Sequence, residues 1–134
     1  MQQMIMTDAH DVYRRQGVLT ASPMELIIML YDGLRKDMLI AERAIKKDDA
    51  AQAHHNLVKA QDIVNELINC LDLSLSISKD LLALYEFILH ELEAINVAKD
   101  AERIPPLLEI IGTLRDTWQE ISVGNKGSLY LEEE

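Results

Sequence analysis

The stretch "TASPMELIIMLYDGL", Thr20 to Leu34, sets where the first long helix begins and how apolar it is. Ser22 and Glu25 have the spacing of a capping box, and Pro23 stands at the first helical position, where its missing amide hydrogen costs nothing. Six apolar residues then follow without interruption, from Leu26 to Tyr31. A helix in a water-soluble domain needs an apolar stripe about 100° wide. This helix therefore has more apolar surface than one core contact uses.

The composition indicates a single all-α domain. The chain has 134 residues, enough for one core. Hydrophobic residues make up 49% of it but aromatic residues only 4%, which favours Leu, Ile, Ala and Met packed between helices. The formal net charge of -10 repels phosphate backbones, so we expect no nucleic-acid partner.

The location that the sequence predicts is the cytoplasm. Cys70 is the single cysteine and cannot form an internal disulfide, and the N-terminal residues do not have the pattern of a signal peptide. Charged residues interrupt every apolar run well short of the ~20 residues that a membrane crossing requires. We expect a soluble cytoplasmic protein without direct membrane insertion.

Apolar spacing predicts four helices, over about 23–47, 50–71, 79–98 and 105–123. Asp49 is the predicted cap of the second helix and Ser78 of the third, and Gly124 is predicted to end the fourth. Helices of similar length with short connections pack as an antiparallel up-and-down bundle. We therefore expect a four-helix bundle over 20–123, an N-terminal arm over 1–19 with a short helix near 8–16, and a disordered acidic tail over 124–134.

Each predicted helix has a core seam. The second and fourth helices have clean seams, with spacings that alternate between three and four. The seams are Leu26, Ile27, Leu30, Leu34, Met38, Ala41 and Ile45; then Ala50, Ala53, Leu57, Ala60, Val64, Leu67 and Leu71; then Leu81, Leu84, Tyr85, Ile88, Leu92 and Ile95; and then Leu107, Ile111, Leu114, Trp118 and Ile121.

The first and third helices have apolar residues outside these seams. They are Ile28, Met29, Leu39 and Ile40 on the first helix, and Leu82, Phe87 and Leu89 on the third. Apolar patches of this kind mark a surface that something covers. Three covers fit: the N-terminal arm, a second copy of the chain, or an amphipathic helix from another protein. The sequence leaves these alternatives open, and we expect a monomer or a weak homodimer.

The sequence has no recognisable catalytic or metal-binding pattern. The di-iron sites of helical bundles use Glu-x-x-His pairs, whereas Glu86 and His90 are four residues apart and form the only such pair. His54 and His55 are adjacent and point about 100° apart, which suits a shared metal poorly. Cys70 has no nearby basic group in the sequence. We expect a binding protein, not an enzyme, and no cofactor.

Four segments closely resemble the flagellar secretion chaperone family FliS. They are "TASPMELIIMLYDGL", "KAQDIVNELINCLDL" (Lys59 to Leu73), "LLALYEFI" (Leu81 to Ile88) and "LRDTWQEI" (Leu114 to Ile121), and the likeness runs from about Tyr13 to Ile121. The resemblance implies a cytoplasmic chaperone that binds the C-terminal disordered region of flagellin, prevents premature polymerisation and delivers flagellin to the flagellar type III export gate. A self-associating adaptor bundle without an export role is the alternative.

The resemblance also implies which residues bind partners. It places Tyr13 in the arm that contacts the cytoplasmic domain of the export-gate protein, and Thr20 to Gly33 on the flagellin-contacting surface. Leu84, Arg115 and Asp116 match other recurring segments, and Trp118 belongs either to them or to the core. A flagellin-associated regulatory protein is a further candidate partner. With the surplus apolar residues, the expected partner-binding set is Tyr13, Pro23, Met24, Ile28, Met29, Tyr31, Leu39, Ile40, Leu82, Tyr85, Phe87 and Leu89.

This sequence departs from the family pattern at three places. The connection between the second and third helices lacks the glycines that many relatives have, Phe87 stands where tyrosine is frequent, and "RIPPLL" shortens the start of the fourth helix. These departures leave the predicted bundle intact. They affect the end of the surface near that connection.

Overall fold

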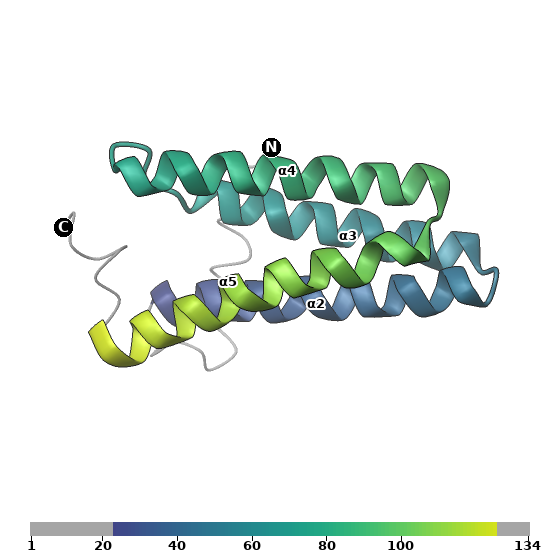
Figure 1. Cartoon of the computed structure of the whole chain (residues 1–134), viewed down its shortest axis with the longest axis horizontal. Coiled ribbons are helices and arrows are strands. Elements are labelled where there is room, and N and C mark those ends of the chain that lie inside the picture. Colours follow the sequence, from purple (N-terminus) through teal and green to yellow (C-terminus); the bar gives the residue numbers. More distant parts are fainter. Residues whose placement is uncertain (1–22, 126–134) are drawn as a thin grey trace, which may run out of the picture.

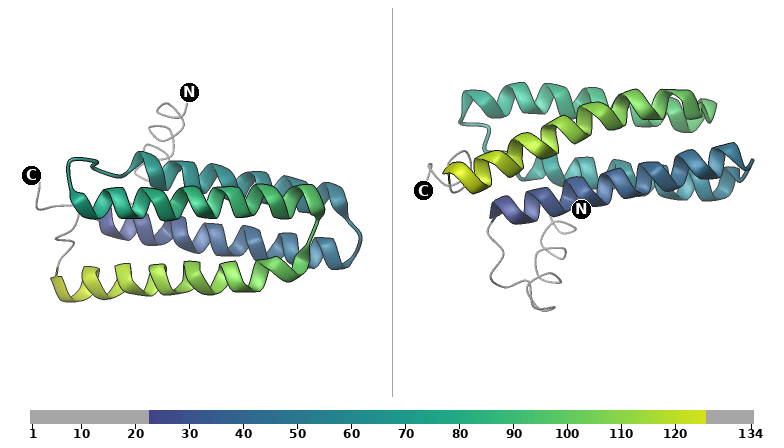
Figure 2. Two further views of the ribbon diagram at one scale, coloured as in Figure 1. Left: turned by 45° about the horizontal axis from the view of Figure 1, so that its top comes forward. Right: turned by 60° about the horizontal axis from the view of Figure 1, so that its bottom comes forward.

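The structure, a computed structural model that describes residues 23–125, is an antiparallel bundle of four α-helices in that range (Figures 1 and 2). The predicted all-α bundle is confirmed. The predicted cap Ser22, the arm with Tyr13 and its short helix, and the tail after Asn125 lie outside the described residues. The elements are α2 (Pro23–Lys46), α3 (Ala50–Asn69), α4 (Ser76–Ala98), a short 3-10 helix η1 (Ala101–Arg103) and α5 (Ile104–Asn125).

The start of α3 follows the sequence prediction, but the start of α4 does not. Asp49 caps α3, because its side chain accepts a hydrogen bond of 3.1 Å from the backbone amide of Gln52. The helix α4 begins at Ser76, so the predicted cap Ser78 is wrong: Ser78 lies inside the first turn and is buried. The Asp72 carboxylate accepts hydrogen bonds from the Ser74 amide and hydroxyl, at 3.0 and 2.7 Å. This local turn shortens the connection and lets the helix begin earlier.

The fourth helix begins and ends close to the predicted residues. Pro105 and Pro106 lie in the first turn of α5, where backbone amides have no intrahelical acceptor and proline is tolerated. The preceding turn is η1, and the Asp100 carboxylate caps it by accepting from the Glu102 amide at 3.1 Å. The helix continues one residue past Gly124, to Asn125, so Gly124 does not end it.

Two tight turns lie at the same end of the bundle. The turn between α2 and α3 contains Asp48 with φ 59°, and the turn after α4 contains Lys99 with φ 52°. These left-handed conformations are uncommon for residues other than glycine. The Lys99 ammonium donates hydrogen bonds to the Asn96 backbone carbonyl and side-chain oxygen, at 2.6 and 2.7 Å, which secures the second turn. Asp48 and Lys99 line one small hollow, so the two turns are neighbours.

The core follows the predicted seams in their central parts. In α3 the seam is fully buried from Ala53 to Leu67, whereas Ala50 is exposed at the start of the helix and Leu71 lies beyond its end. In α5, Leu114 and Ile121 are half-buried. The residues of the seams that are buried are Ile27, Leu30, Leu34, Met38, Ala41, Ala53, Leu57, Ala60, Val64, Leu67, Tyr85, Ile88, Leu92, Ile95, Leu107, Ile111 and Trp118.

The helices form an open ring in the order α4, α3, α2, α5. The helix α2 packs along both α3 and α5, and α3 packs along α4, whereas α4 and α5 contact each other only sparsely. The left view of Figure 2 shows α4 and α5 running side by side with a gap, behind which α2 is visible. One edge of the bundle is therefore bounded by two helices that do not pack tightly together.

A polar cluster lies in the interface between α2 and α3. Asp37 is only 4% exposed, and its carboxylate accepts a hydrogen bond of 3.2 Å from the Asn56 side-chain amide. Gln52 donates a hydrogen bond to the side-chain oxygen of Asn56. The Lys59 ammonium lies 3.6 Å from the Asp37 carboxylate. Because a buried charge is costly unless it is paired, these contacts explain how Asp37 is accommodated.

Candidate partner-binding surface

Four residues of the expected partner-binding set are buried in the monomer. Met24, Tyr31 and Tyr85 are at most 1% exposed, and Ile28 is 7% exposed. The expectation that Ile28 is surplus apolar surface is wrong. Ile28 lies one turn before Asp32, on the side of α2 that holds an ion pair to α5. Because α2 packs against helices on both flanks, it needs a wider apolar stripe than a helix with a single neighbour.

A hydrogen-bonded aromatic cluster joins three helices in the core. The hydroxyl oxygens of Tyr31 on α2 and Tyr85 on α4 lie 2.5 Å apart, and the Trp118 indole on α5 donates to the Tyr31 hydroxyl at 3.1 Å. Burial raises the pKa of Tyr31 to about 12, against the smaller opposing effect of these two hydrogen bonds. Trp118 is 4% exposed and part of the core, which decides between the two roles that the sequence allowed.

Six further residues of the expected set lie at the surface or are half-buried. Met29 and Phe87 are exposed, at 37% and 47%. Leu39 and Ile40 line a hollow of about 430 Å³ on the outer face of α2. Leu82 and Leu89 are half-buried, and Pro23 opens α2. The apolar residues outside the core seams therefore lie on two separate surfaces, the outer face of α2 and a surface of α4.

The α4 side of the open edge is apolar. Glu91 accepts two hydrogen bonds of 3.0 Å from the Arg103 guanidinium, which lies directly before α5, so this side of α4 faces α5. Leu84 and Ile77 lie seven and fourteen residues before Glu91 and share its face. Ile77 is 42% exposed and Leu84 is half-buried. Phe87, one turn before Glu91, borders the same face.

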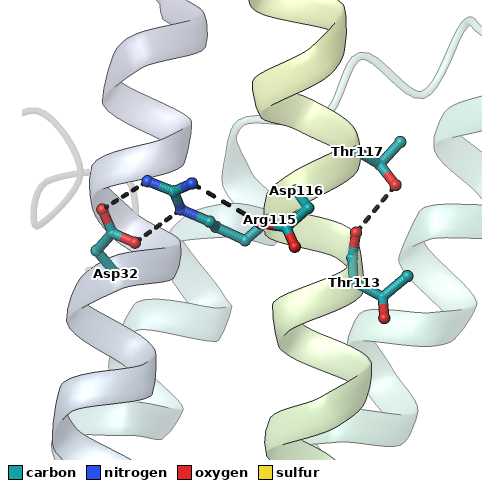
Figure 3. A network of polar contacts seen from close by, with 5 residues as sticks. All are labelled: Asp32, Thr113, Arg115, Asp116 and Thr117. Carbon is teal, nitrogen blue, oxygen red and sulfur yellow. Dashed lines mark hydrogen bonds and ion pairs between the residues drawn. The ribbon is translucent and has the colours of Figure 1, made fainter.

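The α5 side of the open edge is identified by the contacts that α5 makes with α2. The Arg115 guanidinium donates to the Asp32 carboxylate of α2 at 2.9 and 3.4 Å, while Thr113 and Thr117 lie on the other side of α5 (Figure 3). The Thr117 hydroxyl donates to the Thr113 carbonyl at 2.9 Å. Residues on the helical stripe beside these threonines therefore point away from α2. Those residues are Ile110, Leu114 and Ile121.

We call the six apolar residues of both sides the α4–α5 edge: Ile77, Leu84, Phe87, Ile110, Leu114 and Ile121. Leu84, Leu114 and Ile121 also pack against the core, and Ile110 is 36% exposed. The sequence prediction found Phe87 but missed Ile77, which it placed in a loop, and Ile110, which it left outside the seam. It assigned Leu84, Leu114 and Ile121 to core seams. The available signal was the pair Ile110–Ile111, since adjacent residues of a helix point about 100° apart and Ile111 is the one that continues the seam.

Chemically reactive groups do not converge in the described part of the chain. Across residues 23–125 no three His, Cys, Asp or Glu side chains are placed to hold a metal ion. His54 instead lies 3.0 Å from the Asn96 side-chain nitrogen of α4, and His90 lies 2.8 Å from its own helix's Glu86 carbonyl. Burial, and to a lesser degree Glu66, raises the pKa of the Cys70 thiol to about 12. Such a thiol carries little reactive thiolate at neutral pH.

None of the helices between Pro23 and Asn125 combines the length with the apolar character that crossing a bilayer requires.

Comparison with known proteins identifies the family. The family model described as "Flagellar protein FliS" matches residues 6–125. The chain is 31% identical over 117 residues to the flagellar secretion chaperone FliS of Bacillus subtilis, covering 87% of this chain and 88% of that protein. It is 30% identical over 109 residues to the flagellar secretion chaperone FliS of Salmonella typhimurium, covering 79% and 81% of the two chains.

A solved structure supports the fold independently. A bacterial flagellar chaperone crystal structure matches with a TM-score of 0.71 at 18% identity, over 96% of this chain and 98% of that one. At this identity the match speaks for the fold alone. The family model and the relatives show that the chain belongs to the FliS family of flagellar secretion chaperones.

Proposed function

We propose that this chain binds the C-terminal segment of flagellin in the cytoplasm, prevents its premature polymerisation and delivers it to the flagellar export gate. The observation that carries the proposal is the α4–α5 edge, a set of apolar residues on the facing sides of two sparsely packed helices. Membership of a family of flagellar secretion chaperones supports flagellin as the bound protein.

An edge of this kind suits an amphipathic segment. Such a segment has an apolar stripe that later contacts identical neighbours in a filament, and the stripe would associate too early if it were exposed. Inserted between α4 and α5, the stripe meets apolar residues on both sides. A segment that folds only on binding loses part of the interaction energy to ordering, which eases release. Neither catalysis nor a cofactor takes part.

Delivery involves a second contact. We assign it to the N-terminal arm around Tyr13, and the family resemblance supports the cytoplasmic domain of the export-gate protein as the partner of this arm. The arm and the α4–α5 edge are separate in sequence, so the chain can hold flagellin while it docks. A flagellin-associated regulatory protein is a further candidate partner for the flagellin-binding surface of this chain.

Calorimetry with a peptide of the flagellin C-terminal segment tests the proposal. We expect saturable one-to-one binding and a higher melting temperature of the bundle in the presence of the peptide. Ile110→Asp should weaken binding by about tenfold or more while the helical circular dichroism spectrum is kept, because the charge enters the docking surface and not the core. Absence of binding heat and of a thermal shift would contradict the proposed function.

Met29→Asp is the matched control. Met29 and Ile110 are equally exposed, at 37% and 36%, but Met29 lies on the outer face of α2. Binding should survive Met29→Asp. If Met29→Asp abolishes binding and Ile110→Asp does not, the flagellin segment docks on α2 and the α4–α5 edge is not its site.

Self-association is the competing function for the same edge. Two copies could bury their α4–α5 edges against each other and act as an adaptor without an export role. Light scattering over a wide concentration range measures the molecular mass in solution and distinguishes self-association from the chaperone function. A mass that stays at one chain supports the chaperone proposal, and a stable dimer that excludes the peptide contradicts it.

A further inference from the structure

The outer face of α2 concentrates positive charge on a chain whose net charge is -10. Arg35, Lys36 and Arg43 surround the hollow of about 430 Å³ that is lined by Leu39 and Ile40. All three basic residues are exposed. Local fields of one sign attract groups of the opposite sign even when the whole molecule is acidic.

These charges are not compensated within the described part of the chain. Lys46, Lys59, Arg103 and Arg115 each form an ion pair with a carboxylate. No carboxylate between residues 23 and 125 forms an ion pair with Arg35, Lys36 or Arg43. The remaining acidic residue of the hollow, Asp32, is already paired with Arg115.

The complementary chemistry lies in the segment that follows α5. Residues 128–134 read "SLYLEEE", three large apolar or aromatic residues and then three glutamates, without a basic residue. Exposed Met29 lies seven residues before Lys36, on the same face of α2. Along α2, the apolar side chain of Met29 comes before the basic side chains. Residues 128–134 have the same order, with apolar residues first and then the glutamates that could pair with the basic side chains.

The geometry brings the two within reach. The ion pair of Arg115 with Asp32 sets the level of α5 against α2, and the two helices run in opposite directions. Asn125 is ten residues beyond Arg115, about 15 Å along the axis, and Lys36 lies about 6 Å on the other side of that level. Nine residues, 126–134, span at most about 30 Å. The glutamates therefore reach Arg35 and Lys36, about 21 Å away along the axis, but Arg43, about 10 Å further, lies beyond the span of the segment.

We infer that residues 128–134 fold back along the outer face of α2, with Glu132 to Glu134 at Arg35 and Lys36 and with Leu129 to Leu131 beside Met29. The proposal concerns this chain alone and needs no flagellin. It also leaves the α4–α5 edge open.

Paramagnetic NMR tests this inference directly. A nitroxide label is attached to Glu134→Cys in a Cys70→Ala background, and amide signals are compared with those of the diamagnetic label. We expect loss of intensity at the amides around Arg35 and Lys36 and none at Leu84 or Phe87. The loss should disappear in 1 M salt, where the Debye length is only about 3 Å.

Charge reversals supply matched controls. Lys36→Glu should restore the signals, whereas Arg43→Glu, the same charge change beyond reach of the segment, should not. Replacing Glu132 and Glu133 by Lys together with Lys36→Glu and Arg35→Glu should bring the intensity loss back. The result that overturns the inference is loss confined to amides near Asn125, loss on the α4–α5 edge, or loss that appears only when labelled and isotope-labelled chains are mixed.

Discussion

The hydroxyl oxygens of Tyr31 and Tyr85 lie 2.5 Å apart in the interior of the bundle and connect α2 to α4 across the core. The Trp118 indole adds a hydrogen bond from α5 to the same Tyr31 oxygen. The Tyr31 hydroxyl group therefore joins α2, α4 and α5. This contact maintains the bundle although α4 and α5 pack sparsely.

The first prediction concerns the hydroxyl group of Tyr31. Tyr31→Phe removes the hydrogen bonds that this hydroxyl forms with Tyr85 and Trp118. With about 1 kcal/mol for each buried hydrogen bond, the free energy of unfolding should fall by about 2 kcal/mol. Urea unfolding followed by circular dichroism measures the loss. An unchanged free energy of unfolding would show that the two hydrogen bonds contribute nothing to stability.

The second prediction concerns alkaline pH. Burial raises the pKa of Tyr31 to about 12 in the folded chain, from 10.0 for an unperturbed tyrosine. The folded state therefore disfavours the phenolate, and the associated stability is complete below pH 10 and is lost as pH rises through 12. The loss amounts to about 3 kcal/mol at one pKa unit per 1.36 kcal/mol.

Tyr31→Phe provides the control for this pH dependence. Cys70, whose pKa is also raised to about 12, titrates in the same range in both proteins. The difference in slope of unfolding free energy between pH 10 and 12 therefore belongs to Tyr31. Parallel slopes would contradict the prediction.

The third prediction compares two lysines of similar exposure. Lys59 is 53% exposed and pairs with Asp37, whose side chain is 6% exposed, while Lys46 is 65% exposed and pairs with Glu42, whose side chain is 16% exposed. Lys59→Ala leaves a buried carboxylate without its cation and should cost about 1–3 kcal/mol. Lys46→Ala should cost less than about 1 kcal/mol. Thermal unfolding of both variants distinguishes the buried pair from the exposed pair, and equal costs would refute the distinction.

The fourth prediction uses two glycines inside helices. A methyl group added at Gly112 of α5 meets no atom within 4 Å, whereas at Gly33 of α2 it lies 3.4 Å from the Ile63 side chain of α3. Gly112→Ala should therefore raise the unfolding free energy by about 1 kcal/mol, the full difference in helix propensity. Gly33→Ala should gain less, because Ile63 must adjust. A larger gain at Gly33 than at Gly112 in urea unfolding would refute this reading.

The sequence predicts the helices well because apolar periodicity is a local signal. The seam from Ala53 to Leu67 is buried as its spacing predicts, and Asp49 caps α3 through its own side chain. The prediction of Ser78 as a cap was wrong because the turn at Asp72, which depends on a side-chain conformation, lets α4 begin earlier, at Ser76.

The candidate surface was predicted only in part, because it depends on how helices are placed. Ile28 is buried since α2 lies between two helices, which periodicity within α2 does not reveal. Phe87 is exposed as expected. Ile110 is exposed because α5 lies apart from α4, and periodicity within α5 does not reveal that spacing. The buried Asp37 likewise depends on its partner Asn56, which lies 19 residues away on another helix.

The pair of turns at Asp48 and Lys99 has a consequence for how the bundle opens. Both turns are tight, they are neighbours, and the capping contacts of Asp49, Lys99 and Asp100 secure that end. Within residues 23–125, the opposite end has one connection between helices, the longer one between α3 and α4. Backbone amides near Lys46 and Ala98 should therefore exchange their hydrogens with heavy water more slowly than those near Asn69 and Ser76, so that local opening starts at the opposite end.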